Sequence, residues 1–136
     1  MKTHRPRVLV VEDDESARQV LSLLLAKAEY EVHEAVDGVQ AVRKLEASRY
    51  DVVITDYQMP RLNGLQLLNL CQIVWPETLL VLVSGERANL PALASQHGAF
   101  AWLAKPYDAK ELLHVIRIAL ERKAVLRADR VAAETP

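Results

Sequence analysis

The sequence predicts an α/β fold with a doubly wound, five-stranded parallel sheet, because short apolar runs alternate with segments of helical spacing. The apolar runs occupy residues 8–11, 31–35, 52–54, 79–83 and 100–103. Most are rich in Val, Leu or Ile, as strands buried on both faces are. Strands that alternate with helices form parallel sheets with helices on both faces and right-handed crossovers. We expect the strand order 2-1-3-4-5, which is one of the two common doubly wound arrangements.

Hydrophobic spacing defines the first two strand–helix pairs. Apolar residues recur at intervals of three and four after the first run, at Ala17, Val20, Leu21, Leu24 and Ala28. This spacing predicts an amphipathic helix. The second run, residues 31–35, alternates apolar and charged residues, which favours an edge strand. A second helical stripe follows Asp37-Gly38 and consists of Val39, Val42 and Leu45.

The later helices are predicted from stripes of apolar residues and from residues that start or stop helices. A helix carrying Leu65, Leu68 and Cys71 follows Asn63-Gly64 and is closed by Pro76. We interpret Cys71 as a core residue. Residues 91–96 are a short candidate helix, with Gly98 as its stop signal. The last helix starts at Asp108, which forms a capping box with Glu111, and carries Leu112, Ile116, Ala119 and Leu120.

Composition excludes several classes of protein. The 136 residues suit one domain of ordinary size, and 17 Lys plus Arg against 18 Asp plus Glu argue against a nucleic-acid-binding module. A single Cys excludes an internal disulfide framework. The histidines His4, His33, His97 and His114 lack zinc-ligand spacing. We expect no targeting segment and no membrane span, and therefore a cytoplasmic protein.

Acidic residues follow two strands that should be neighbours. Glu12-Asp13-Asp14-Glu15 comes after the first strand, and Asp56 follows the third. In the order 2-1-3-4-5 the switch point lies between these strands, so Asp13 and Asp56 would share one crevice. Carboxylates held close together repel each other unless a cation is present. Oxygen ligands of this kind suit Mg²⁺, which keeps several waters and combines carboxylates with a phosphate.

The fourth and fifth strands bring a hydroxyl and an ammonium group to the same edge. Ser84-Gly85 follows the fourth strand, and Lys105-Pro106 follows the fifth. In-line phosphoryl transfer needs a nucleophile, Mg²⁺ and positive groups that neutralise the phosphoryl oxygens. Aspartate carboxylates can accept a phosphoryl group as aspartyl-phosphates. The four strand ends together therefore indicate phosphoryl chemistry.

At this point the chain resembles the receiver domains of two-component response regulators, over residues 7–123. The resemblance rests on the stretches VLVVEDDE, DVVITDYQMPRLNG, LVSG and WLAKPYD, in this order and spacing. It implies that Asp56 is the phospho-acceptor, that Asp13 binds Mg²⁺ (or Mn²⁺) directly and that Glu12 acts through water. The Gln58 backbone carbonyl would complete the protein ligands. Ser84 and Lys105 would contact the phosphoryl group, with a Lys105-Pro106 bond that is typically cis.

The sequence departs from the family at the position of the aromatic switch. This position usually holds Tyr or Phe, whereas here it is Trp102, whose larger indole group only donates hydrogen bonds. A packed or surface-patch tryptophan without a switch role is the alternative. Gln58 and Glu86 occupy the variable positions that flank the phosphoryl group in the family.

The resemblance also implies the partners. A histidine kinase or a phosphotransfer protein would donate the phosphoryl group. An output domain or downstream protein would bind the face formed by the helix near Pro91, the fifth strand and the last helix. The sequence leaves open whether the protein forms a homodimer. We expect no direct nucleic-acid or membrane binding. Residues 1–6 would be an N-terminal extension, and residues 124–136 would extend the last helix or form a linker tail.

Three other functions compete with this one. A Mg²⁺-dependent phosphohydrolase working through a phospho-aspartate usually has a second Asp two residues after the nucleophile. Here that position is Gln58, which cannot transfer protons. A flavodoxin-like cofactor binder would need a hydroxyl- or glycine-rich loop after the first strand, where this chain has acids. A degenerate receiver that acts only as an interaction module is the third alternative.

Overall fold

The computed structural model describes residues 5–85 and 98–134, with side chains up to residue 129. Strands and helices alternate along the chain as the sequence predicts. They are β1 (Arg7–Val11), α1 (Glu15–Lys27), β2 (Glu31–Ala35), α2 (Gly38–Ala47), β3 (Val52–Asp56), α3 (Gly64–Val74), β4 (Leu79–Ser84), β5 (Ala101–Ala104) and α5 (Ala109–Glu134). The helix predicted over residues 91–96 lies outside the described residues.

All five strands pair in parallel, in the order β2-β1-β3-β4-β5. This confirms the predicted doubly wound sheet, and β2 lies at one edge as its alternating pattern indicates. In the register of the central strands, Val8 of β1 is aligned with Val32 of β2 and with Val52 of β3. The switch point of strand order therefore lies between β1 and β3, where the sequence places the acidic residues.

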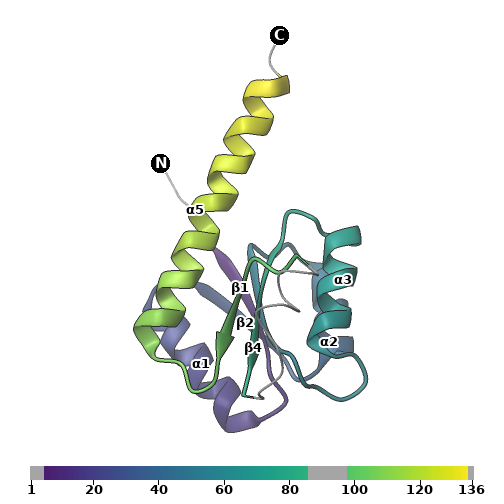
Figure 1. Ribbon diagram of the computed structural model, residues 1–136, viewed down its shortest axis with the longest axis vertical. Coiled ribbons are helices and arrows are strands. Elements are labelled where there is room, and N and C mark those ends of the chain that lie inside the picture. Colours follow the sequence, from purple (N-terminus) through teal and green to yellow (C-terminus); the bar gives the residue numbers. More distant parts are fainter. Residues whose placement is uncertain (1–4, 86–97, 135–136) are drawn as a thin grey trace.

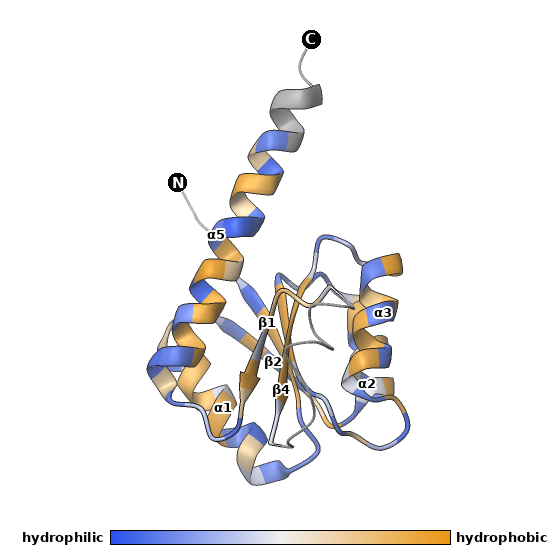
Figure 2. Cartoon of the chain, in the orientation of Figure 1, coloured by the Kyte–Doolittle hydropathy of each residue, from blue (hydrophilic) through white to orange (hydrophobic). Residues whose placement is uncertain are grey.

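Helices cover both faces of the sheet (Figure 1), whose strands are rich in hydrophobic residues (Figure 2), and each face carries its own hydrophobic cluster. Alternate strand residues point to opposite faces, so Leu9 and Val53 join one cluster, whereas Val10 and Ile54 join the other. The first cluster packs against α2 and α3, and it includes Cys71, which is buried as expected. The second cluster packs against α1 and α5. No helix within the described residues is long and apolar enough to cross a membrane.

Helix α1 buries a slightly different face from the one that its apolar stripe predicts. Leu21 and Leu25 are its buried residues, whereas Val20 is 68% exposed. The buried side of α1 is therefore rotated by one residue from the predicted stripe, and Val20 faces solvent. The expectation was wrong at Val20 because five apolar residues in close sequence make more than one helical stripe possible. In α5 the predicted residues Leu112 and Ile116 are indeed fully buried.

Side-chain caps fix where the helices begin. The carboxylate or amide oxygens of these caps accept backbone N–H groups from the first turn, which otherwise lack partners. The pairs are Asp14 with Ala17, Asp37 with Gln40, Asn63 with Gln66 and Asp108 with Glu111. At α3 the Gln66 side chain also accepts the N–H of Asn63, which completes a capping box.

Helix α5 continues past the body of the domain, and an ion pair anchors it where it leaves the sheet (Figure 1). Lys123 Nζ donates to Asp51 Oδ1 over 2.7 Å, and the backbone N–H of Arg7 donates to Asp51 Oδ2 over 2.8 Å. Burial acts to raise the pKa of Asp51, but these hydrogen bonds outweigh it and hold the pKa below its usual value. Asp51 therefore links α5 to the start of β1.

We expect Lys123→Met to lower the free energy of unfolding by about 1 kcal/mol at neutral pH, because the ion pair is only partly exposed. A carboxyl group with a lowered folded-state pKa contributes stability above its unfolded pKa, and this stability disappears as the pH falls through the folded pKa. The difference between wild type and variant should thus shrink in acid. Urea unfolding at several pH values measures this, and a difference independent of pH would contradict it.

Candidate functional site

The register of the central strands brings two acidic residues together at the carboxyl edge of the sheet. Val11 of β1 is aligned with Thr55 of β3, so the residues that follow them lie side by side: Glu12 directly after β1 and Asp56 as the last residue of β3. One carboxylate oxygen from each of Glu12, Asp13 and Asp56 lies within 4.8 Å of the others. The structure therefore brings together the acids that the sequence places at separate strand ends.

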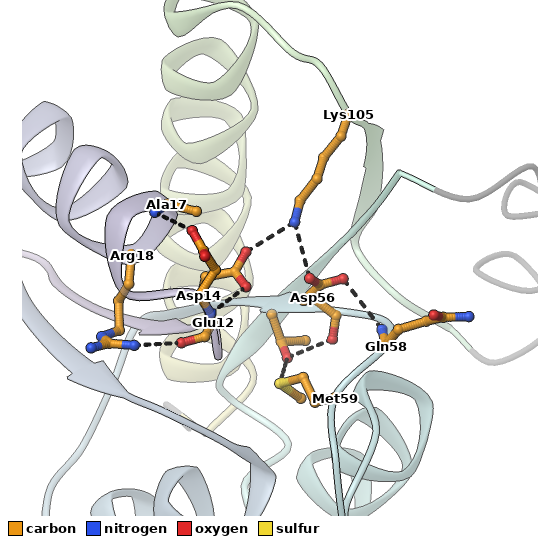
Figure 3. A network of polar contacts seen from close by, with 9 residues as sticks. Glu12, Asp14, Ala17, Arg18, Asp56, Gln58, Met59 and Lys105 are labelled. Atoms are coloured by element: carbon orange, nitrogen blue, oxygen red, sulfur yellow. Dashed lines mark hydrogen bonds and ion pairs between the residues drawn. The ribbon is translucent and has the colours of Figure 1, made fainter.

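Lys105 bridges two members of this acidic cluster (Figure 3). Its Nζ lies 2.9 Å from Glu12 Oε1 and 3.0 Å from Asp56 Oδ2. Lys105 follows β5, and β4 lies between β5 and β3. The long side chain of Lys105 therefore extends past the end of β4 to reach the acidic residues. The ammonium group thus compensates the negative charge that three adjacent carboxylates would otherwise concentrate.

The charged groups of the site differ in their exposure. The side chains of Glu12 and Asp56 are 8% and 13% exposed, whereas Asp13 is open to solvent. Burial raises the pKa of Glu12 above its ordinary value, and the Lys105 hydrogen bond only partly offsets this. Burial acts to lower the pKa of Lys105, but its bonds to Glu12 and Asp56 outweigh it and raise the pKa. Lys105 accordingly stays cationic at neutral pH.

The consecutive acids after β1 have separate structural roles. Asp14 caps α1, and its N–H donates to Glu12 Oε2 over 3.1 Å. Both carboxylate oxygens of Glu12 are therefore engaged, one by Lys105 and one by this backbone group. Asp13 is the exposed acid of the cluster, so its carboxylate is the more accessible to a ligand from solvent.

The remaining residues predicted for the site differ in how the structure places them. Ser84 ends β4 and is 1% exposed, and its carbonyl accepts the N–H of Lys105 over 2.9 Å. The N–H of Gln58 donates to Asp56 Oδ1 over 3.2 Å. Trp102 lies on β5 and is 40% exposed, so it is not a core residue. The Lys105-Pro106 peptide bond is cis. Glu86 lies outside the described residues.

Gly64 allows α3 to begin directly against the backbone of the Asp56 loop. Its N–H donates to the carbonyl of Tyr57 over 2.9 Å. A Cβ atom at this position would lie 2.5 Å from the Asp56 carbonyl oxygen and 2.9 Å from Tyr57 Cα. These are backbone atoms, which cannot move aside as a flexible side chain would. The sequence alone gave Gly64 only a role in a helix start, and its contact with Asp56 needed the structure.

We expect Gly64→Ala to destabilise the protein by about 2 kcal/mol, because the added methyl group overlaps backbone atoms of the Asp56 loop. Gly85→Ala is the matched control. Its Cβ would come no nearer than 3.5 Å to Lys105 Cβ, so we expect a change within about 0.5 kcal/mol. Urea unfolding of both variants tests the contact, and equal stabilities of the two variants would disprove it.

The sequence pattern of the response regulator receiver domain family matches residues 8–117. The chain belongs to this family. The match runs from the second residue of β1 into the first half of α5 and so contains the whole acidic cluster. The chain is therefore a receiver domain of the two-component signalling systems, as the motifs indicate, and the fold is the receiver fold.

Curated relatives of this receiver domain include longer regulatory proteins. The DNA-binding transcriptional regulator NtrC of Azospirillum brasilense is 34% identical over 126 residues, which are 90% of this chain and 26% of that protein. The transcriptional regulatory protein GlrR of Escherichia coli K12 is 32% identical over 130 residues, which are 94% and 29% of the two chains. The chain thus spans less than a third of the length of either relative.

Solved receiver structures match the fold closely. The signal receiver domain of an HD domain-containing protein from Pseudomonas fluorescens is 34% identical with a TM-score of 0.85, and the match covers 90% of this chain and 99% of that one. A response regulator receiver domain protein from Clostridium thermocellum is 31% identical with a TM-score of 0.83, over 89% and 98% of the two chains. Both matches span nearly the whole receiver fold.

Proposed function

We propose that this receiver domain accepts a phosphoryl group on Asp56, with Mg²⁺ bound, from a histidine kinase or a phosphotransfer protein. The observation that supports this most is that Asp56 lies close to two other carboxylates and in direct contact with the Lys105 ammonium group. Its carboxylate is partly accessible, which a nucleophile requires, and it lies where positive charge can stabilise a phosphoryl group. The receiver would comprise residues 7–123, and residues 124–136 would extend it.

The donor set suits a hard divalent cation. Carboxylate oxygens in a partly open cluster are ligands that Mg²⁺ prefers, and Mn²⁺ accepts the same ligands. We assign Asp13, Asp56 and the Gln58 backbone carbonyl as direct ligands, with Glu12 acting through water because Lys105 and the Asp14 N–H engage its oxygens. When bound, the cation would supply positive charge that neutralises the phosphoryl oxygens and helps to orient the donor.

In the transfer step, a carboxylate oxygen of Asp56 attacks the phosphorus atom of the donor. A new O–P bond forms while the bond from phosphorus to the donor nitrogen breaks, and the imidazole keeps the electron pair. Lys105 is already within 3.0 Å of Asp56, so its ammonium group can move from the carboxylate to a phosphoryl oxygen. Ser84 lies at the end of the neighbouring strand, and its hydroxyl group would donate a hydrogen bond to a second phosphoryl oxygen.

The signal would be a shift between two conformations that the phosphoryl group contacts differently. Lys105 contacts Asp56 and follows β5, and its backbone N–H donates to the carbonyl of Ser84 at the end of β4, so movement of Lys105 and Ser84 would be transmitted to the face that includes Trp102 and α5. Trp102 is exposed on β5, where an aromatic switch residue would lie. An output domain or a downstream protein would bind this face.

The experiment is phosphorylation with acetyl phosphate, read by intact-protein mass spectrometry. We expect wild type to gain the mass of one phosphoryl group in the presence of Mg²⁺ and to gain none when EDTA removes it. Treatment with hydroxylamine, which attacks the acyl carbon of acyl phosphates, should release phosphate and replace the added phosphoryl mass by the smaller mass increase of an aspartyl hydroxamate. A protein that stays unmodified with Mg²⁺ would favour the degenerate receiver, and repeated turnover of a phosphate ester would favour the phosphohydrolase.

A further inference from the structure

Arg18 on α1 contacts both the loop that carries the acidic cluster and the edge strand β2. Its NH1 group donates to the backbone carbonyl of Glu12 over 2.9 Å, and its Nε donates to Glu34 Oε1 over 3.0 Å (Figure 3 shows the first). The Arg18 side chain is only 13% exposed, although it is charged. A guanidinium group has donors in a rigid fork, so two acceptors can hold it in one orientation.

With these contacts, every polar group of Glu12 forms a hydrogen bond. Its backbone N–H donates to the carbonyl of Ala35 in β2 over 3.1 Å, and its carbonyl accepts from Arg18. Its carboxylate accepts from Lys105 and from the N–H of Asp14. Arg18 therefore contributes to fixing the chain direction after β1, which sets where the next residue, Asp13, lies.

We propose that Arg18 is a positioning residue for the divalent cation, acting through the Glu12 backbone and anchored by Glu34. This inference rests on the proposed function, because it concerns the same cation site. Ligand groups held in place before the cation arrives bind it more tightly, since less conformational freedom is lost on binding. Among the residues of α1, all of which the structure describes, only Arg18 donates a hydrogen bond to the Glu12 carbonyl.

The charge of Arg18 makes the sign of its effect diagnostic. A cation close to the site repels Mg²⁺, so a purely electrostatic role predicts tighter Mg²⁺ binding when Arg18 is removed. A positioning role predicts weaker binding, because the Glu12 carbonyl loses its donor and the loop is freed. The two roles therefore change the Mg²⁺ dissociation constant in opposite directions.

The experiment measures Mg²⁺ binding by isothermal titration calorimetry for wild type, Arg18→Met, Arg18→Lys and Glu34→Gln. We expect Arg18→Met to raise the Mg²⁺ dissociation constant by about tenfold, as loss of groups that orient metal ligands commonly does. Arg18→Lys keeps the charge but not the fork, so its constant should also rise, by less. Glu34→Gln removes the anchor from a partly exposed position and should weaken binding mildly. Lys27→Met, which removes a cation from the last turn of α1, is the control.

A second reading separates positioning from general damage. The rate of phosphorylation by acetyl phosphate is measured as a function of Mg²⁺ concentration. In Arg18→Met the Mg²⁺ concentration that gives half of the maximal rate should be higher than in wild type, whereas the maximal rate should be the same. Binding that is unchanged or tighter in Arg18→Met, or a plateau that falls without any shift in the Mg²⁺ requirement, would overturn the inference. Wild type that binds no Mg²⁺ would instead refute the proposed cation site itself.

Discussion

Asp56→Asn should abolish phosphorylation of this protein by acetyl phosphate. The amide has nearly the same shape as the carboxylate, and it can still occupy the space beside Lys105 and accept a hydrogen bond from the Gln58 N–H. It lacks the negative charge and nucleophilic oxygen that form the O–P bond. We expect no phosphoryl gain at times when wild type is fully modified, as read by intact mass.

The matched control is Asp14→Asn, which makes the same chemical change in a neighbouring acid. Asp14 caps α1 through Ala17, and Asn is as good a cap as Asp. This variant should be phosphorylated at close to the wild-type rate. If Asp56→Asn were modified as fast as Asp14→Asn, the acceptor would be another residue and the proposed function would be wrong at its central step.

The second large effect is expected from Lys105→Met. Without the ammonium group, Glu12 and Asp56 lose their shared cation in a largely buried site. We expect the metal-free protein to lose about 2 kcal/mol of stability, less than a fully buried pair would cost, because about a third of the Lys105 side chain is exposed. The Mg²⁺ dissociation constant should fall, since the competing cation is gone.

Urea unfolding with EDTA and with Mg²⁺ measures both effects of Lys105→Met. The variant should recover more stability on Mg²⁺ addition than wild type does, because a ligand that binds the native state more tightly stabilises it more. Weaker Mg²⁺ binding would show that Lys105 orders the acidic cluster rather than competing with the cation. Lys105→Met and Arg18→Met are therefore predicted to change Mg²⁺ affinity in opposite directions, although each removes one positive charge.

Much of the fold could be predicted from local patterns. The five apolar runs are the strands, and the parallel order follows from their alternation with helices. The exact buried face of α1 could not be predicted, because its many apolar residues allow neighbouring stripes and only packing against the sheet selects Leu25 over Val20. The Asp51–Lys123 ion pair was also missed, because its partners are 72 residues apart and no local pattern links them.

The acidic cluster was predictable because parallel strands bring their carboxyl ends to one edge. Its finer organisation was not. Asp13 was predicted for the site, but the separate role of Asp14 as the cap of α1 became clear only in the structure. Arg18 carried no signal of its own, since a charged residue in an amphipathic helix usually faces solvent. Its contact with the Glu12 carbonyl appears only once α1 packs beside β1 and β2.

The most direct measurement of the central claim identifies the phosphorylated residue chemically. Wild type is treated with acetyl phosphate and Mg²⁺ and then with borohydride, which reduces an aspartyl-phosphate to homoserine. Peptide sequencing by mass spectrometry then locates the homoserine. We predict homoserine at position 56 and none at Asp13 or Asp14. Homoserine at another position, or none anywhere in a protein shown to be folded, would contradict the assignment of Asp56 as the phospho-acceptor.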